Sequence, residues 1–235
     1  MSNFGWVDTT VFPKNFVLEH GLACRIEDRF IVRPDRPVPT NGVSGAAREH
    51  WLSYGIVGSG ILRRYRAVMD YASANLFLDL AQERLVHQPG LSQETMREEG
   101  YAAIPMNWDD KMLRWAVSGQ INDANLTFLL DTGSSVTCVD RPLAYRISFS
   151  GPETEVGLTG ETHREGAKAS RVRVTELRLG DFPTETTHVY ITPPGEHNTP
   201  GFLIGADVLA RHSAVLDFGE SMLYLKRANM KRKTR

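Results

Sequence analysis

The sequence has little of what usually identifies a protein class from composition alone. It holds only two cysteines in 235 residues, too few for the disulfide framework of a small secreted domain. Its 27 basic and 28 acidic residues give a formal net charge of -1, which exerts no general attraction on nucleic acid or membrane surfaces. No apolar run approaches the roughly 20 residues that a membrane-spanning helix needs. These absences exclude specialised classes and leave an ordinary globular protein.

The same scarcity bears on redox state, metals and location. Cys24 and Cys138 could form one disulfide, but the composition favours reduced, buried thiols. The seven histidines include no pair with metal-ligand spacing, so we expect neither a zinc site nor a cofactor. Residues 1–8 have neither the basic nor the apolar segment of a signal peptide, which makes the cytoplasm the default location. A periplasmic or secreted location would follow if the true N-terminus lay upstream of Met1.

Strand patterns dominate the second half of the chain. Residues 112–121 and 126–130 have strand length and apolar content, and the turn-forming residues 122–125 between them predict a β-hairpin. Residues 80–99 are rich in Gln, Glu and Arg around a Pro-Gly pair, which predicts a linker with some helical tendency and a domain boundary near residue 100. Further strands are predicted over 171–179 and 187–192, and a short helix over 208–211.

An internal repeat relates the two halves of the chain. Residues 58–71 align with 205–218 at a constant offset (205 − 58 = 147), and the match continues without a gap to 76–78 against 223–225. The density of matches, with apolar positions in step, exceeds what chance gives over so short a window. In the first copy the identical residues are Gly58, Leu62, Arg64, Ala67, Val68, Asp70, Leu76 and Leu78.

A candidate catalytic carboxylate, Asp131, directly follows the second strand of the predicted hairpin. The segment 128–135 reads Phe-Leu-Leu-Asp-Thr-Gly-Ser-Ser, so an apolar strand delivers the carboxylate and Gly133 would permit a tight turn where a Cβ would clash. A second apolar segment, Phe-Leu-Ile-Gly, follows much later at 202–205. Asp-Thr-Gly alone is weak evidence, since an Asp in a turn commonly caps its own loop through local hydrogen bonds.

Together with the closing segment Ala-Val-Leu-Asp-Phe-Gly-Glu-Ser-Met-Leu-Tyr-Leu at 214–225, these two segments resemble the retropepsin-like aspartic proteases. The resemblance covers about residues 103–226, with both motifs in the family's order and spacing. It implies a mainly β fold, a closed β-barrel lobe of the acid-protease type, in which Asp131 is the catalytic residue in a loop beneath the substrate cleft.

The resemblance also implies supporting roles around Asp131. Thr132 would bond across to its counterpart in a second half-site. The Gly133 N–H would face the carboxylate, and the Ser134 hydroxyl would hold its outer oxygen. The family's flap hairpin falls, as a loose match, at residues 156–160. Three residues would brace the loop from behind: Leu203, Ile204 and Gly205.

One carboxylate cannot perform this chemistry alone. Peptide hydrolysis needs one carboxylate to activate water and one carboxylic acid to protonate the carbonyl oxygen, and two such groups in contact share one proton. Subtracting the repeat offset (131 − 147 = −16) places the first copy's Asp before Met1. We therefore expect another chain to supply the second Asp, with a homodimer through Asp131 as the first interpretation. Asp8, in Trp-Val-Asp-Thr-Thr, is a degenerate candidate with Thr10 where glycine is expected.

We divide the chain into four parts on these grounds. The last part, the basic tail, lacks interleaved aromatic residues, which favours a solubilising role over specific nucleic-acid binding. The parts are a partial or divergent aspartic-protease-like lobe over 1–80, a linker over 81–102, a retropepsin-like lobe over 103–226 and the tail over 227–235.

The sequence thus predicts an aspartic endopeptidase that hydrolyses peptide or protein substrates without a cofactor, a membrane span or a specific nucleic-acid partner. Two alternatives stay open. One is a non-catalytic, protease-like module that binds peptides or supports assembly, and the other is a fragment of a longer two-lobed protease. Whether the chain is an active enzyme depends on the second Asp.

Overall fold

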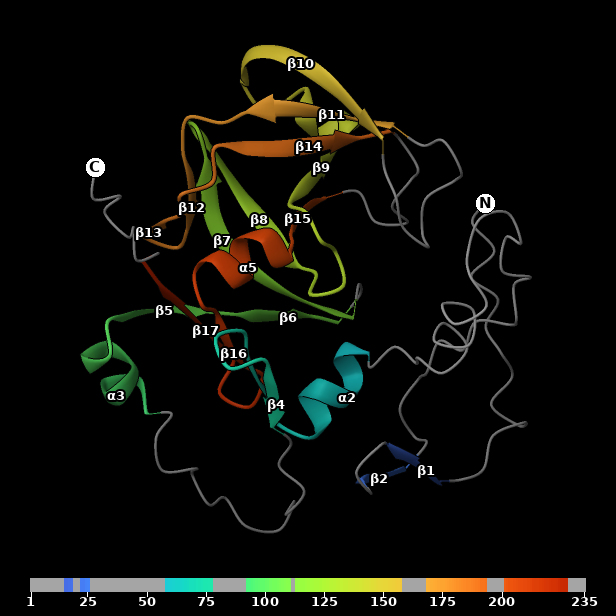
Figure 1. The fold of residues 1–235 in the computed structure, drawn as a ribbon, viewed down its shortest axis with the longest axis vertical. Helices are drawn as coiled ribbons and strands as arrows, with labels where there is room; N and C mark the ends of the chain where they lie inside the picture. The colour runs from blue at the N-terminus through green and yellow to red at the C-terminus, as the bar shows by residue number, and fades with distance from the viewer. Residues whose placement is uncertain are drawn as a thin grey trace, which may run out of the picture. The chain divides into compact units, whose positions relative to one another are not determined.

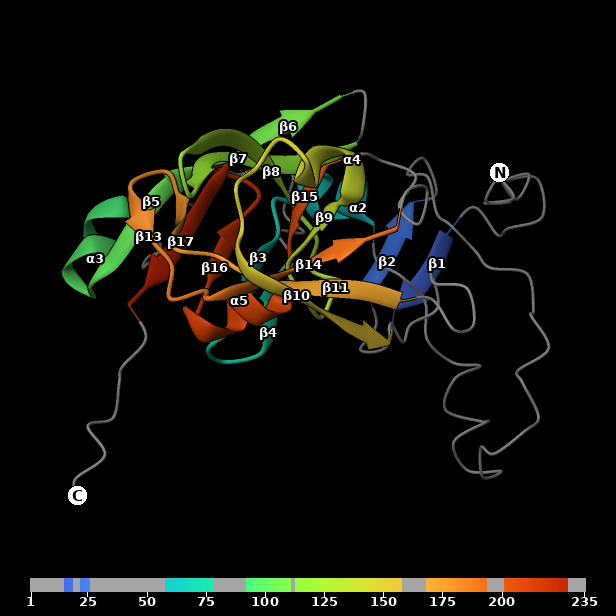
Figure 2. The same ribbon diagram turned by 90° about the horizontal axis from the view of Figure 1, so that it is seen from above.

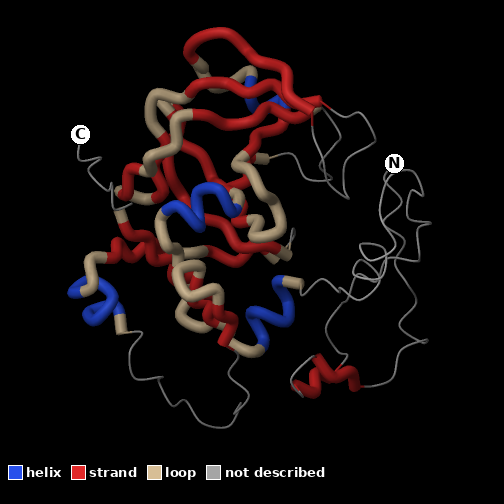
Figure 3. The backbone as a smooth tube through the Cα atoms, in the orientation of Figure 1, coloured by secondary structure: helices blue, strands red, loops and turns tan. Residues whose placement is uncertain are grey.

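The computed structural model describes the part of the chain in which most strands were predicted. The chain forms two compact units, residues 1–64 and residues 65–235. Strands predominate in the second unit, which confirms the predicted mainly β fold (Figure 3). The described residues are 58–77, 92–110, 113–157, 168–193 and 201–227, with the backbone of 15–18 and 22–25.

The first unit contributes a hairpin and a short helix. Strands β1 (Asn15–Leu18) and β2 (Leu22–Arg25) pair antiparallel. Helix α2 (Ser59–Arg64) follows Gly58 and carries two buried side chains, Ile61 and Leu62. The degenerate candidate Asp8 lies outside the described residues. None of the helices in the described ranges is long and apolar enough to cross a membrane.

The second unit is built on a ten-stranded sheet. Its strands run in the order β10-β11-β14-β9-β15-β8-β7-β12-β13, and β6 pairs with β7 off this path (Figure 1). The elements are β6 (Asn107–Asp109), β7 (Arg114–Ile121), β8 (Ala124–Leu130), β9 (Cys138–Asp140), α4 (Arg141–Ala144), β10 (Ser150–Gly157), β11 (Lys168–Arg173), β12 (Leu177–Leu179), β13 (Phe182–Pro183), β14 (His188–Thr192), β15 (Phe202–Ile204) and α5 (Ala206–Arg211).

Several predicted elements are present close to their expected positions. β7 and β8 form the predicted hairpin, in register from Ala116 opposite Leu129 to Ile121 opposite Ala124. β14 is the strand predicted over 187–192, and α5 is the predicted short helix. In the linker region, α3 (Gln93–Glu98) gives the expected helical tendency, with the Ser92 hydroxyl accepting the Thr95 N–H at 3.1 Å as an N-cap. The lobe boundaries at residues 80 and 102 stay predictions.

The strand predicted over 171–179 is broken, so that prediction is wrong in its continuity. The alternation is real, because Val172, Val174 and Leu177 are all buried, but β11 ends at 173 and β12 starts at 177. The Asn122 side-chain oxygen accepts the N–H groups of residues 175 and 176 at 2.9 and 3.2 Å. The Asn122 side chain thus satisfies two backbone N–H groups in the connection between β11, which pairs with β14, and β12, which pairs with β7. Strand periodicity does not encode this change of pairing partner.

A second, five-stranded sheet lies in the order β4-β3-β16-β17-β5. Figure 2 shows β3, β16, β17 and β5 following one another across this sheet. Met96 of α3 packs on this sheet in one cluster with four of its buried side chains: Val68, Val215, Met222 and Tyr224. The strands are β3 (Val68–Asp70), β4 (Asn75–Phe77), β5 (Tyr101–Pro105), β16 (Val215–Asp217) and β17 (Met222–Lys226).

The sequence repeat has a counterpart in the backbone of this sheet. α5, β16 and β17 repeat α2, β3 and β4 in order, and the hairpin registers agree at the offset of 147. Val68 lies opposite Phe77 as Val215 lies opposite Tyr224, and the next two pairs correspond in the same way.

The two hairpins also pair with each other symmetrically. β3 and β16 run antiparallel with Met69 opposite Leu216, which are equivalent residues of the repeat. The Tyr71 N–H donates to the Ala214 carbonyl at 2.9 Å, and the equivalent Phe218 N–H donates to the Ala67 carbonyl at 2.9 Å. An approximate twofold axis therefore passes between Met69 and Leu216 and relates the two hairpins.

The turns of the hairpins agree in detail. The Asp70 carboxylate accepts the N–H groups of residues 72 and 73, and the Asp217 carboxylate accepts those of the equivalent residues 219 and 220. Positive φ angles also recur at equivalent positions, 44° at Arg66 with 47° at Ser213, and 55° at Ala74 with 56° at Ser221. The hydrogen bonds of Asp70 and Asp217 give both carboxylates a structural role in their turns.

His212 holds the end of α5 in place. It is 1% exposed, its Nδ1 lies 3.0 Å from the carbonyl oxygen of Lys226, and its Nε2 accepts the Glu185 N–H at 3.3 Å. The His212 ring also packs edge-on against the ring of Phe182, with ring centroids 5.2 Å apart. Both ring nitrogens are thus satisfied by the neutral imidazole with its proton on Nδ1, and burial lowers the pKa of His212.

We predict that His212 makes the protein less stable in acid. Because its pKa is lower in the folded chain, the unfolded chain binds the additional proton first, and the free energy of unfolding falls as pH drops below about 6.5. His212→Gln should cost about 1 kcal/mol at neutral pH and should flatten the fall between about pH 7.5 and 5. Urea unfolding at both pH values measures this. Partial burial and the charges of Arg171 and Arg173 also lower the pKa of His188, so this residue is kept in both proteins and the difference between the parent and His212→Gln isolates His212. An unchanged pH slope in His212→Gln would contradict the prediction.

Candidate active site

Asp131 lies in the loop that directly follows β8. Its N–H donates to the carbonyl oxygen of Ile204 at 3.0 Å, which extends the parallel pairing of β8 and β15 by one bond into the loop. The Asp131 carbonyl oxygen accepts the Ser134 N–H at 3.2 Å, so a turn begins at this residue. The Asp131 residue is half-buried, which places a carboxylate at the surface end of a buried strand.

One predicted contact to the carboxylate is present and another is not. The Gly133 N–H donates to Asp131 Oδ1 at 3.0 Å, as predicted. The Ser134 hydroxyl instead donates to the carbonyl oxygen of Val136 at 2.7 Å, because that carbonyl has turned toward it within the same loop. Thr132 is half-buried beside Asp131, and its bond to a second half-site stays a prediction.

The glycine that the loop sterically requires is Gly205, not Gly133. A Cβ on Gly133 would meet only Asp131 Oδ1 at 3.4 Å, an ordinary contact, so the predicted clash is wrong. A Cβ on Gly205 would lie 2.5 Å from both the carbonyl carbon and the oxygen of Val136, and 3.0 Å from the Ser134 oxygen. The chain can therefore cross behind the Asp131 loop only without a side chain at 205.

β15 lies directly behind the Asp131 loop. It lies between β8 and β9, parallel to the first and antiparallel to the second, and Phe202, Leu203 and Ile204 are at most 2% exposed. Phe202 meets Phe128 edge-on, with ring centroids 4.9 Å apart. Beyond the strand, the Ala206 N–H donates to the Ser134 carbonyl at 2.8 Å, so both sides of the Asp131 loop are tied to one segment.

Thr137 is a supporting residue that the sequence interpretation missed. It is fully buried, its hydroxyl donates to Asp207 Oδ1 at 2.7 Å, and its oxygen accepts the Gly205 N–H at 3.1 Å. The loop is thereby joined to the first turn of α5. The only signal in the sequence was a hydroxyl residue within the apolar run before β9.

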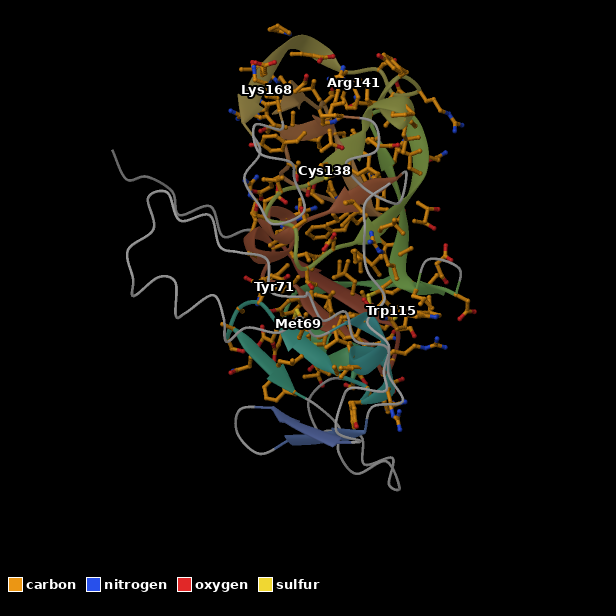
Figure 4. The ribbon with its side chains drawn as sticks, turned by 90° about the vertical axis from the view of Figure 1, so that its right-hand side faces the viewer. Met69, Tyr71, Trp115, Cys138, Arg141 and Lys168 are labelled. Atoms are coloured by element: carbon orange, nitrogen blue, oxygen red, sulfur yellow. The ribbon has the colours of Figure 1, made fainter. Side chains whose placement is uncertain are left out.

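The negative charge of Asp131 contributes to raised pKa values of two neighbouring side chains, Cys138 and Tyr71. Burial raises the pKa of Cys138 to about 12, and the negative charges of Asp131, Asp207 and Asp140 add to this effect. Cys138 is thus a buried thiol that stays protonated, in agreement with the reduced state predicted for it. Tyr71 also has a raised pKa, caused by burial and then by the charge of Asp131. Figure 4 labels Tyr71 near Met69, so this side chain comes from the first copy of the repeat.

Residues 156 and 157, the described part of the predicted flap, form the end of β10. Val156 pairs with Ala169 and Gly157 with Lys168 of β11, while residues 158–160 lie outside the described ranges. Arg141 of α4 donates to Ser170 Oγ at 2.9 Å and to Glu153 at 3.4 Å, which ties both strands of the β10–β11 hairpin to this helix. The Ser170 hydroxyl, and then Arg141, lower the pKa of Glu153. Among the described residues no group of three His, Cys, Asp or Glu side chains could hold a metal ion.

Residues 117–208 match the sequence model of the aspartyl protease family. The matched range starts in β7 and ends in α5, so it contains the Asp131 loop and its brace. Over this range, which is less than half of its length, the chain is similar to the aspartyl proteases. The match confirms the resemblance inferred from the two sequence motifs. A comparison with curated proteins gave no match.

Two solved protease structures are similar to the chain. A retropepsin-like aspartic protease from Rickettsia conorii is 17% identical, with a TM-score of 0.40, and the match covers 54% of this chain and 90% of that one. The EIAV protease complexed with the inhibitor HBY-793 is 20% identical, with a TM-score of 0.32 and coverage of 43% and 89%.

We predict that Gly205→Ala disrupts the Asp131 loop. The added Cβ must displace the backbone of Val136, which should cost about 1–3 kcal/mol of unfolding free energy. Gly157→Ala is the matched control, because no atom lies within 4 Å of its Cβ, and it should change stability by less than about 0.5 kcal/mol. Chemical denaturation of both variants measures the difference, and equal stabilities would contradict the steric argument.

A second prediction concerns Thr137→Val, which keeps the shape of the side chain and removes both hydroxyl bonds. The buried Gly205 N–H and Asp207 carboxylate then lose a partner, at a cost of about 2 kcal/mol. The exposed Thr127→Val variant in β8 is the control and should stay within about 0.5 kcal/mol of the parent protein. Thermal unfolding of the two variants tests this, and a neutral Thr137→Val would show that the hydroxyl does not stabilise the loop.

Proposed function

We propose that the chain is an aspartic endopeptidase in which Asp131 supplies one of two catalytic carboxylates. The observation that carries this proposal is the fixed Asp131 loop. A backbone N–H at 3.0 Å faces the carboxylate, and the strand behind it holds the Asp131 N–H at 3.0 Å. An Asp that merely capped its own turn would not need a brace of this kind. The family match over 117–208 supports the same conclusion.

The proposed chemistry uses water and a pair of carboxyl groups. One ionised carboxylate accepts a proton from water, whose oxygen attacks the scissile carbonyl carbon. The partner carboxylic acid donates its proton to the carbonyl oxygen, and the amine leaves after it receives a proton in turn. Because two carboxyls in contact share one proton, the two apparent pKa values belong to the pair, and activity falls when both groups are ionised or both protonated.

In this proposal the second Asp comes from another chain, and residues 58–77 are the tail of a first, partial lobe. The equivalent hairpins of β3–β4 and β16–β17 support this assignment, since they share register, turn bonds and a twofold axis. Thr132 would then bond to the matching residue of the partner loop. The β10–β11 hairpin would act as the flap over a bound peptide. Pairing of two Asp131 residues in a homodimer stays a prediction.

The direct test is cleavage of an unfolded protein substrate between roughly pH 2 and 5, where a pair of catalytic carboxyl groups of this kind holds one proton. Asp131→Asn should abolish cleavage, because the amide cannot act as a base. Asp123→Asn, in the exposed β7–β8 turn, is the matched control and should keep full activity. Mass spectrometry of the products measures both. Absence of cleavage at every pH and chain concentration, with the protein folded, would overturn the enzymatic proposal.

A further inference from the structure

One face of the ten-stranded sheet carries a continuous row of side chains. In each pair of neighbouring strands from β7 to β10, one member of the row lies directly opposite the next, so all of them project to the same side of the sheet. The row ends in polar side chains, after apolar members that pack together in one cluster. Its members are, in order across the sheet, Ala116, Leu129, Leu203, Cys138, Tyr190, Arg171 and Thr154.

Asp131 belongs to this same face of the sheet. It follows Leu129 by two residues, and its N–H bond to the Ile204 carbonyl continues the pairing of β8 with β15 as far as the carboxylate. Burial and then the charge of Asp131 raise the pKa of Cys138, as expected for a member of the row that lies close to the carboxylate. The apolar part of the row thus passes beside Asp131.

The other end of the face is cationic. Arg171 and Arg173, two residues apart on β11, are both exposed, and His188 of β14 lies opposite Arg173. The registers of the intervening strands make β11 parallel to β8. The step from Arg171 to Arg173 therefore runs in the same direction as the step from Leu129 to Asp131, and the cationic residues continue the two levels of the face on which the carboxylate lies.

The charges of these two arginines are not balanced within the described ranges. Neither forms an ion pair there, and the two acidic residues of β10, Glu153 and Glu155, are already paired with other cations. After burial, the charges of Arg171 and Arg173 lower the pKa of His188, so the three side chains share one electrostatic environment. Like charges about 6.6 Å apart along a strand repel each other, and an anion bound between them would relieve this repulsion.

We propose that Arg171 and Arg173 are specificity-determining residues, which bind an acidic side chain of the peptide that is cleaved at Asp131. A guanidinium group forms paired hydrogen bonds with a carboxylate, a geometry that lysine cannot provide. The apolar members of the row would face an uncharged part of the same peptide. The inference rests on the proposed function, because it names the substrate class of the Asp131 site.

The sheet determines how far the acidic residue lies from the cleaved bond. Three strands, β15, β9 and β14, separate β8 from β11 (Figure 1). At the usual strand spacing this corresponds to about 19 Å along the sheet, which an extended peptide spans with about six residues. Because sheet twist shortens the direct path, we expect the acidic side chain roughly three to six residues from the cleaved bond.

Peptide binding to the full chain tests this specificity. The protein carries Asp131→Asn, so that no peptide is consumed, and the probe is a fluorescein-labelled peptide with two central leucines in a background of alanine and serine. A single Glu is placed in turn at each position on both sides of the leucines, with Gln at the same position as the reference. At about pH 5, where most free Glu side chains are ionised, Glu at one or two adjacent positions should bind about three- to tenfold more tightly than Gln, as measured by fluorescence anisotropy.

Variants of the two arginines identify the group that binds the acidic residue. Arg171→Gln with Arg173→Gln should remove the preference for Glu, and Arg171→Glu with Arg173→Glu should reverse it in favour of peptides with Lys. Arg146→Gln, which removes an exposed arginine beyond α4, should leave the preference unchanged. No preference at any position, an equal preference at every position, or a preference that survives the double Gln variant would each overturn the inference.

Cleavage of the same peptides by the unsubstituted chain separates this inference from the proposed function. Position-specific binding of Glu with no cleavage at any pH would uphold the acidic-peptide site and reject the proposed activity. Cleavage of the Glu and Gln peptides with equal kcat/KM at every position would uphold the activity and reject the specificity.

Discussion

The passage of β15 between β8 and β9 is the constraint on which the site depends. This strand of three residues bonds to both neighbours, fills the core beside Phe128, and delivers Gly205 to the back of the Asp131 loop. The loop has no regular structure of its own, so its shape is set by what lies behind it. Its carbonyl at Ser134, its hydroxyl at Thr137 and its first N–H are all bonded to residues 204–207. The carboxylate is thus oriented by a segment far away in sequence.

The five-stranded sheet adds a second constraint, which is symmetry. Two hairpins of related sequence pair with each other about Met69 and Leu216, so each hairpin covers one edge of the other. Tyr71, whose hydroxyl lies in the field of Asp131, comes from the first of these hairpins. The surroundings of the carboxylate therefore include a residue from the first repeat copy, although the family match starts only at residue 117.

Local patterns were sufficient to predict much of this fold. Alternation and turn residues identified the β7–β8 hairpin, the repeat offset identified equivalent elements, and two motifs located Asp131 and its brace. The failures were of another kind. The break between β11 and β12 depends on the Asn122 side chain, and the partners of Ser134 and Thr137 depend on which backbone atoms tertiary folding brings near. Gly133 and Gly205 could not be ranked from sequence either, since crowding at a glycine is a property of the neighbouring chain.

The reciprocal pairing of the two hairpins also limits how the gene can change. Tyr71 bonds to Ala214 and Phe218 bonds to Ala67, so each copy supplies the surface on which the other is built. A residue inserted into one hairpin would shift its register against a partner that had not changed, and would turn its inward side chains outward. The two copies therefore cannot drift independently between 67 and 70 or between 214 and 217. Three of the identities within the repeat, at Ala67, Val68 and Asp70, fall inside this shared segment.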